Sequence, residues 1–177
     1  MLTACRFADN NDHAAATHFV FPVDVPNASA AYLLFNGGSL YPQWAGYQVG
    51  RFVLNFADGS NQVVPLIAGY NIRDWAPNNP SDIVNTVTDP RVSQAFFGHL
   101  DYGGYVARID MLSLVLPQTR HLVSIELFDT SRSCSVTPDV GINIYAMTVV
   151  SQVPEPSSIL ALLCGIFTST AYILSGG

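Results

Sequence analysis

Five polar and aromatic residues that follow one another closely are the strongest candidates for ligand binding in this chain. An aromatic ring offers a flat apolar face to a sugar, and amide, guanidinium and carboxylate groups make directed hydrogen bonds to hydroxyl groups. These residue types therefore predict a carbohydrate-binding loop. The five residues are Tyr70, Asn71, Arg73, Asp74 and Trp75.

A structural role for the same loop is the main alternative. Trp75 would then plug one end of the fold, and Arg73 and Asp74 would pair to anchor it. Burial of an indole removes a large apolar area from water, which favours the plug for this residue. Tyr41 and Trp44 supply a second aromatic pair.

Metal and cofactor chemistry has little support. Oxygen ligands for calcium occur at Asp58, Asn61, Asp74 and Asn78, but their spacing follows no calcium-binding loop, so we expect solvated turn residues. No Cys/His spacing resembles a zinc site. We predict no metal and no cofactor.

Catalytic motifs are also scarce. The four histidines lie in unrelated contexts, without a Gly-x-Ser-x-Gly elbow or a His-Glu-x-x-His helix. Asp101 and Asp110 are the carboxylates that a glycoside hydrolase could use, although the sequence does not fix the distance between them. We predict that the chain is not an enzyme, and a hydrolase is the weakest alternative.

Charge excludes one class of partner. The 177 residues contain 11% charged residues, a net charge of −6 and no lysine. A nucleic-acid-binding protein needs clustered cations that displace phosphate counterions, and scattered arginines do not supply them. We therefore exclude nucleic-acid partners.

The elements that must position these residues are predicted to be strands. Short apolar or alternating runs closed by turn residues recur along the chain, and seven of them in one domain predict an all-β, antiparallel β-sandwich. The runs are His18–Val25, Ala31–Phe35, Tyr47–Phe56, Gln62–Ile67, Tyr105–Leu116, His121–Phe128 and Val140–Val150.

Turn residues fix some of the connections. Asp58-Gly59 predicts a hairpin, because glycine tolerates the positive φ of a tight turn. Pro65 in the second strand of that hairpin predicts an edge or a bulge. The stretch 76–91 is rich in Pro, Asn, Asp and Ser and predicts a long loop.

The segment Val49–Trp75 resembles galactose-binding-like jelly-roll modules of secreted bacterial proteins. In it a strand, the Asp58-Gly59 turn and the Gly69-Tyr70-Asn71-Ile72-Arg73-Asp74-Trp75 loop follow in that order. The resemblance extends over most of 32–150 and implies a jelly roll, which places ligands on loops at one end or on a concave face.

The C-terminal residues form a second pattern. Val153, Pro154, Glu155 and Pro156 start an extended strap, because proline fixes φ and disfavours helix in the residue before it. The uncharged run Ile159–Leu174 then predicts a hydrophobic helix of marginal membrane-spanning length. A helix docked on the folded domain is the alternative.

This order of parts resembles the PEP-CTERM sorting signal of exosortase substrates. The resemblance implies an exosortase-type processing enzyme as partner, a membrane anchor before processing, and a final place at the surface or outside of a Gram-negative cell that often makes exopolysaccharide. The basic cluster that usually ends such signals is replaced here by Ser175-Gly176-Gly177.

The start of the chain carries no apolar stretch of signal-peptide length, so we expect the true start to lie upstream of Met1. Leu2-Thr3-Ala4-Cys5 resembles the end of a lipoprotein signal, a weaker alternative. Cys5 and Cys134 are the one possible disulfide pair outside the hydrophobic run, and a free thiol at Cys134 is favoured.

Together these features predict four regions and a function. Residues 1–15 form a poorly ordered segment, 16–151 the β-sandwich, 152–158 the linker with the sorting motif, and 159–174 the transmembrane-type helix. We expect an exported, non-catalytic surface or extracellular-matrix protein. A carbohydrate-binding module that uses the Tyr70–Trp75 loop and binds polysaccharide is the alternative.

Overall fold

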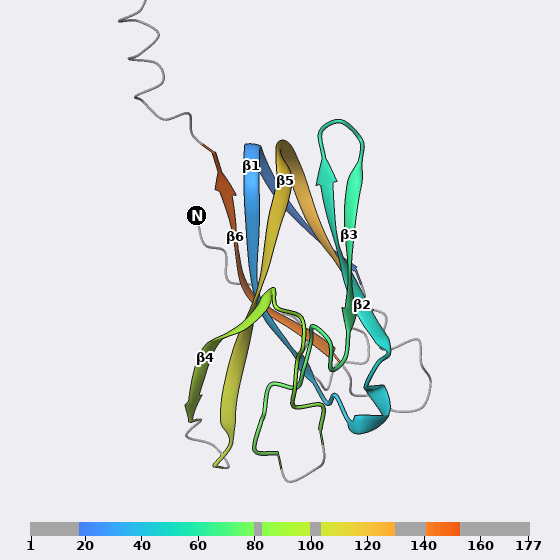
Figure 1. Ribbon diagram of the computed structural model, residues 1–177, viewed down its shortest axis with the longest axis vertical. Coiled ribbons are helices and arrows are strands. Elements are labelled where there is room, and N and C mark those ends of the chain that lie inside the picture. The colour runs from blue at the N-terminus through green and yellow to red at the C-terminus, as the bar shows by residue number, and fades with distance from the viewer. Residues whose placement is uncertain (1–17, 80–82, 100–103, 130–140, 153–177) are drawn as a thin grey trace, which may run out of the picture.

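The computed structural model describes residues 18–79, 83–99, 104–129 and 141–152, and its strands form one antiparallel sheet (Figure 1). This confirms the predicted all-β class. The elements are β1 (His18–Gly38), the 3₁₀ helix η1 (Pro42–Trp44), β2 (Gln48–Phe56), β3 (Asn61–Ile67), β4 (Val92–His99), β5 (Val106–Asp129) and β6 (Gly141–Ser151).

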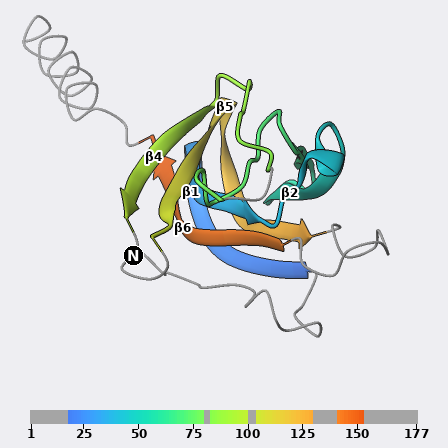
Figure 2. The same ribbon diagram turned by 90° about the horizontal axis from the view of Figure 1, so that it is seen from below.

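Two long strands, β1 and β5, organise the sheet. They pair with each other along most of their length. The sheet has two parts, and each long strand contributes one of its halves to one part and the other half to the second. In one part the order is β3-β2-β5-β1, built from the C-terminal half of β5 and the N-terminal half of β1. In the other part the order is β4-β5-β1-β6, built from the opposite halves (Figures 1 and 2).

Each long strand replaces two shorter strands that the sequence predicted. The runs His18–Val25 and Ala31–Phe35 belong to β1, and Tyr105–Leu116 and His121–Phe128 fall in β5 apart from Tyr105. In β1 the register with β5 shifts between Pro22 and Ala30, and Asp24 and Asn27 adopt φ of 49° and 55°. Such left-handed residues make bulges that bend a strand without ending it, so the prediction of separate strands was wrong.

The core lies between the two parts of the sheet. Phe35 of β1 and Phe52 of β2 are both fully buried, and their rings meet edge to face with centroids 5.9 Å apart. The other large buried side chains come from β1, β2, β3, β5 and the loops between them. This face-to-face packing gives the molecule a sandwich-like architecture.

The predicted hairpin and edge strand are confirmed. Asp58 and Gly59 form the turn between β2 and β3, with Gly59 at φ 81°. β3 lies at the end of the strand order and carries Pro65, which has no N–H to donate. The described residues of the predicted loop 76–91 contain no helix or strand.

Strand β4 was not predicted from the sequence. β4 has side chains exposed on both faces along most of its length, so it shows no alternation of apolar and polar residues. It pairs with the N-terminal half of β5, from Val92 opposite Leu112 to His99 opposite Val106.

Residues 68–76, here called the wedge loop, fill the space where β1 and β5 diverge. The N–H of Gly37 in β1 donates to the Arg73 carbonyl, and the Trp75 N–H donates to the Gly37 carbonyl, each at 2.9 Å. On the other side the N–H of Arg108 in β5 donates to the Trp75 carbonyl at 2.9 Å. The wedge loop thereby joins two strands that no longer pair directly.

Several predictions concern residues outside the described part. They are the segment 1–15, Cys5, Cys134, Asp101, the motif Val153–Pro156 and the hydrophobic run 159–174. Among the residues that the structure does describe, no helix has the length and apolar character needed to cross a membrane.

Candidate functional site

Asn71 closes the first turn of the wedge loop and is 1% exposed. Its Oδ1 accepts a hydrogen bond from the Ile67 N–H at 2.7 Å, and its Nδ2 donates to the Pro65 carbonyl at 2.8 Å. An asparagine is suited to this position because its amide both accepts and donates. Since the amide is used within the fold, Asn71 holds the shape of the loop.

Arg73 pairs with a partner that the sequence did not reveal. Its Nε and Nη2 each donate to one carboxylate oxygen of Asp110 at 2.7 Å, a bidentate ion pair. The Asp110 side chain is 2% exposed, and that of Arg73 is 15% exposed. The predicted pairing of Arg73 with Asp74 is therefore wrong, because β5 places a different carboxylate in front of the guanidinium.

Asp74 is fully buried and binds the backbone. Its Oδ2 accepts from the Leu40 N–H, and its Oδ1 accepts from the Ala76 N–H, both at 2.9 Å. Burial nevertheless raises the pKa of Asp74, and the two backbone donors offset only part of this rise. The carboxylate joins the segment after β1 to the wedge loop.

Arg108 is the buried cation of this region, with 3% exposure. Its Nε donates to the Asp74 carbonyl at 2.7 Å, and its Nη1 donates to the Asn85 carbonyl at 3.1 Å. Burial lowers the pKa of Arg108 to about 10, and the nearby Arg73 contributes to this shift. Its Nη2 has no hydrogen-bond partner among the described residues.

A row of amides and a phenol continues this polar region across the sheet. Asn36 of β1 donates through Nδ2 to the Arg108 carbonyl at 2.7 Å and to the Tyr145 hydroxyl at 3.0 Å. Its Oδ1 accepts from Nδ2 of Asn143 in β6 at 2.9 Å. The polar groups of β5, β1 and β6 therefore form one hydrogen-bonded network.

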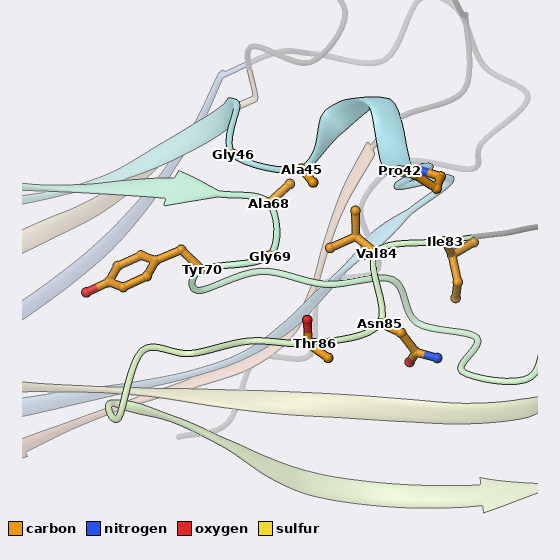
Figure 3. A pocket seen from close by; sticks show the side chains of 10 residues that line it. All are labelled: Pro42, Ala45, Gly46, Ala68, Gly69, Tyr70, Ile83, Val84, Asn85 and Thr86. Atoms are coloured by element: carbon orange, nitrogen blue, oxygen red, sulfur yellow. The ribbon is translucent and has the colours of Figure 1, made fainter.

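A cleft of about 570 Å³ lies beside the wedge loop (Figure 3). Tyr70 stands at one end and directs its ring away from the other lining side chains, while Asn85 and Thr86 supply an amide and a hydroxyl group. The remaining lining residues are small or apolar: Pro42, Ala45, Gly46, Ala68, Gly69, Ile83 and Val84.

Tyr70 is 42% exposed, and its backbone carbonyl is held by the segment before β4. Its carbonyl accepts from the N–H groups of Thr88 and Asp89 at 2.9 Å each. Asp89 in turn holds the guanidinium of Arg91, and this contact is the main cause of the raised pKa of Arg91, to which Tyr70 adds a smaller part. The Asp89–Arg91 ion pair therefore lies beside Tyr70.

The remaining predicted aromatic residues do not form an exposed platform at the cleft. Trp75 is partly buried and meets the ring of Tyr105 at a centroid distance of 6.0 Å. Trp44 is 7% exposed and belongs to the core, with Tyr41 packed against the same core. Of the five predicted loop residues, only Tyr70 lines the cleft.

The four possible calcium ligands do not converge. Asp58 lies in the β2–β3 turn and binds Ser60 and Arg120, whereas Asp74 follows the opposite end of β3 (Figure 1). The side chain of Asn78 is held by Gly104 and Val106. No group of three or more metal-binding side chains occurs in the described ranges.

The chemistry available in the cleft is hydrogen bonding and aromatic contact. Its described lining contains no carboxylate, histidine or cysteine side chain. Asp110, one of the two carboxylates considered for hydrolysis, lies in the buried ion pair with Arg73. Asp101 lies outside the described residues.

Sequence reasoning missed the far wall of the cleft. Asn85 and Thr86 lie in the loop 76–91, whose composition predicts a loop but not its path. The path is fixed by contacts with distant segments, such as the Val84 N–H that donates to the Leu40 carbonyl at 2.7 Å. No local signal in the sequence indicates this contact.

Comparisons with known proteins add no relative. No protein-family model, curated protein or solved structure matches the chain. The function must therefore be inferred from the residues and their geometry.

Proposed function

We propose that this chain is an exported, non-catalytic protein of the cell surface or extracellular matrix, processed at the C-terminal signal Val153–Pro156. The observation that carries the proposal is where the sheet ends. The last strand, β6, ends at Ser151, and the N–H of Gln152 donates to the Asn27 carbonyl at 2.9 Å. The motif therefore starts directly after the folded body.

The position of the core supports processing at this point. Every buried apolar residue of the described core lies between Ala28 and Ile144. Cleavage after β6 would remove none of these residues, so the body would keep its packing. A signal that is cut off after export must be separable from the fold in this way.

In this proposal the hydrophobic run 159–174 anchors the chain in the membrane of a Gram-negative bacterium until an exosortase-type enzyme cleaves it. The body is a sandwich of the galactose-binding-like jelly-roll kind. Support for the body comes from the antiparallel pairing of its strands and from the packing of Phe35 against Phe52. Its role is architectural or adhesive.

The processing test uses the chain fused behind a secretory signal peptide, expressed with and without an exosortase-type enzyme. We expect loss of the tail mass only when the enzyme is present. Replacement of Pro154 and Pro156 by alanine should prevent the loss, whereas Ser157→Ala should not. An unchanged mass of the original chain in the presence of a proven active enzyme would refute the proposal.

A second candidate function is carbohydrate binding at the cleft. The observation in its favour is Tyr70, whose aromatic ring is 42% exposed at one end of a cleft that Asn85 and Thr86 also line. Sugars bind where an apolar ring face lies next to groups that both donate and accept hydrogen bonds.

This function is tested by screening the full chain on a polysaccharide array. Tyr70→Ala should abolish retention. Tyr47→Ala is the matched control, because Tyr47 is 63% exposed and lies outside the cleft lining. Failure of the original chain to bind any glycan would reject the cleft as a sugar site.

A further inference from the structure

Strand β4 is an open edge of the sheet. It pairs with β5 on one side, and among the described residues no strand lies on its other side. Figure 2 shows β4 at the outer margin, beside β5. An unpaired edge presents a row of N–H and C=O groups that can bind another strand.

The edge lacks most of the usual features that prevent strand pairing. Residues 92–98 contain no charged side chain and no proline, in a chain whose net charge is −6. Protein edges are commonly protected by lysine, proline or bulges. The one such feature here is a register shift between Gln94 and Phe96, after which pairing with β5 continues regularly to His99.

Two phenylalanines make this edge apolar. Phe96 is 51% exposed and Phe97 is 54% exposed. The ring of Phe96 lies over Gly98, since a Cβ added at Gly98 would lie 2.7 Å from its Cζ. Neighbouring residues of a strand point to opposite faces, so each face of the edge carries one aromatic ring.

The other edges offer less. In the N-terminal half of β1, which pairs with β5 alone, the one large apolar side chain among the strongly exposed residues is Val20, at 54%. β3 contains Pro65, which removes one backbone donor. In β6 the one large apolar side chain among the strongly exposed residues is Val150, at 41%. β4 is therefore the edge with the most exposed aromatic area.

We propose that β4 pairs with the β4 strand of a second copy of this chain to form an antiparallel, two-fold symmetric dimer. An antiparallel pair of identical strands closes on itself, and the aromatic rings of both copies then lie near the axis. Because both segments are uncharged, two acidic chains can approach here without placing like charges opposite each other. A charged peptide would find no counter-charge on this edge.

The size of the contact sets the strength of the dimer. One strand pair with four phenylalanine rings is smaller than the standard interface of about 1,600 Å². The dimer should therefore be weak and form only at high protein concentration. This inference goes beyond the proposed function and does not depend on it.

The test is sedimentation equilibrium of the full chain in mild detergent, over a wide concentration range. Phe97→Lys places two like charges at the contact and should raise the dissociation constant at least about tenfold. Val63→Lys is the matched control, because Val63 is 52% exposed on β3. It should leave the dissociation constant unchanged.

The thermal midpoint of each variant shows whether the fold is intact. If Phe97→Lys perturbs the fold, Gln94→Lys on the same strand replaces it with the same expected result. The inference is overturned if the chain is monomeric at all concentrations, or if neither β4 variant weakens the dimer. A dimer that appears only after deletion of residues 1–17 would also overturn it, because that segment would then be the partner of β4.

Discussion

Arg73 and Asp110 form a bidentate ion pair that joins the wedge loop to strand β5. Two arginine nitrogens each donate to a separate carboxylate oxygen at 2.7 Å, and the Asp110 side chain is almost completely buried. A few residues away, Arg108 is buried with a lowered pKa. Asp110 therefore neutralises Arg73 directly, and together with Asp74 it offsets part of the positive charge of Arg108.

Removal of this carboxylate should destabilise the protein strongly. Asp110→Asn leaves Arg73 partly buried without its counter-charge, and loss of one partner of a buried pair costs about 3 kcal/mol. The free energy of unfolding, measured in urea, checks this. Asp58→Asn, which alters the exposed pair with Arg120, should have a much smaller effect. Equal effects would show that burial does not matter here.

The ion pair of Asp89 with Arg91 should make the stability of the fold depend on pH in the acidic range. Hydrogen bonds from Arg91 lower the pKa of Asp89 below 3.8, so its contribution is complete above that pH and is lost as pH falls through the folded-state pKa. The difference in unfolding free energy between the original chain and Asp89→Asn should shrink below about pH 4. Urea titrations of both chains between pH 2 and 7 measure this difference in unfolding free energy. A difference that stays constant with pH would contradict the prediction.

The contribution of Asp74 to stability should change with pH in the opposite direction. Burial raises its pKa, so the folded state holds the proton more tightly than the unfolded state does. Its contribution to stability is complete below pH 3.8 and decreases as pH rises through the folded-state pKa. The difference between the original chain and Asp74→Asn should therefore narrow as pH rises. The same urea titrations test this, and widening would show that the backbone donors outweigh burial.

Phe52 should contribute more to stability than any exposed phenylalanine. It is fully buried against Phe35, and truncation of such a ring to alanine costs about 3–5 kcal/mol. Phe97→Ala removes the same atoms from a side chain that is 54% exposed and should change stability by less than about 0.5 kcal/mol. Chemical denaturation at low protein concentration compares them. A small effect of Phe52→Ala would mean that the two parts of the sheet do not pack as described.

Local signals predicted much of the fold. The Asp58-Gly59 hairpin was predictable because glycine is favoured at a positive φ, and the edge position of Pro65 because proline lacks a donor. The boundaries inside β1 were not predictable, since Asp24 and Asn27 resemble turn residues and instead form bulges in a continuous strand. β4 was missed because a strand exposed on both faces shows no alternation.

The candidate site was less predictable than the fold. Residue types alone suggested that five neighbours act together, but the fold separates them: Tyr70 lines one end of the cleft, while Asn71 and Asp74 bind the backbone. The partner of Arg73 is 37 residues away in sequence. Such contacts depend on how strands distant in the sequence pair, and no short motif specifies them.

The place of β1 in the sheet has a kinetic consequence. β1 is the first strand of the described chain, yet its neighbours are β5 and β6, the last two. A ribosome produces β1 long before either neighbour, and contacts between distant segments form slowly. The sheet therefore cannot be completed until Ser151 has been made, and β1 gains its first neighbour in the sheet only when β5 has been synthesised.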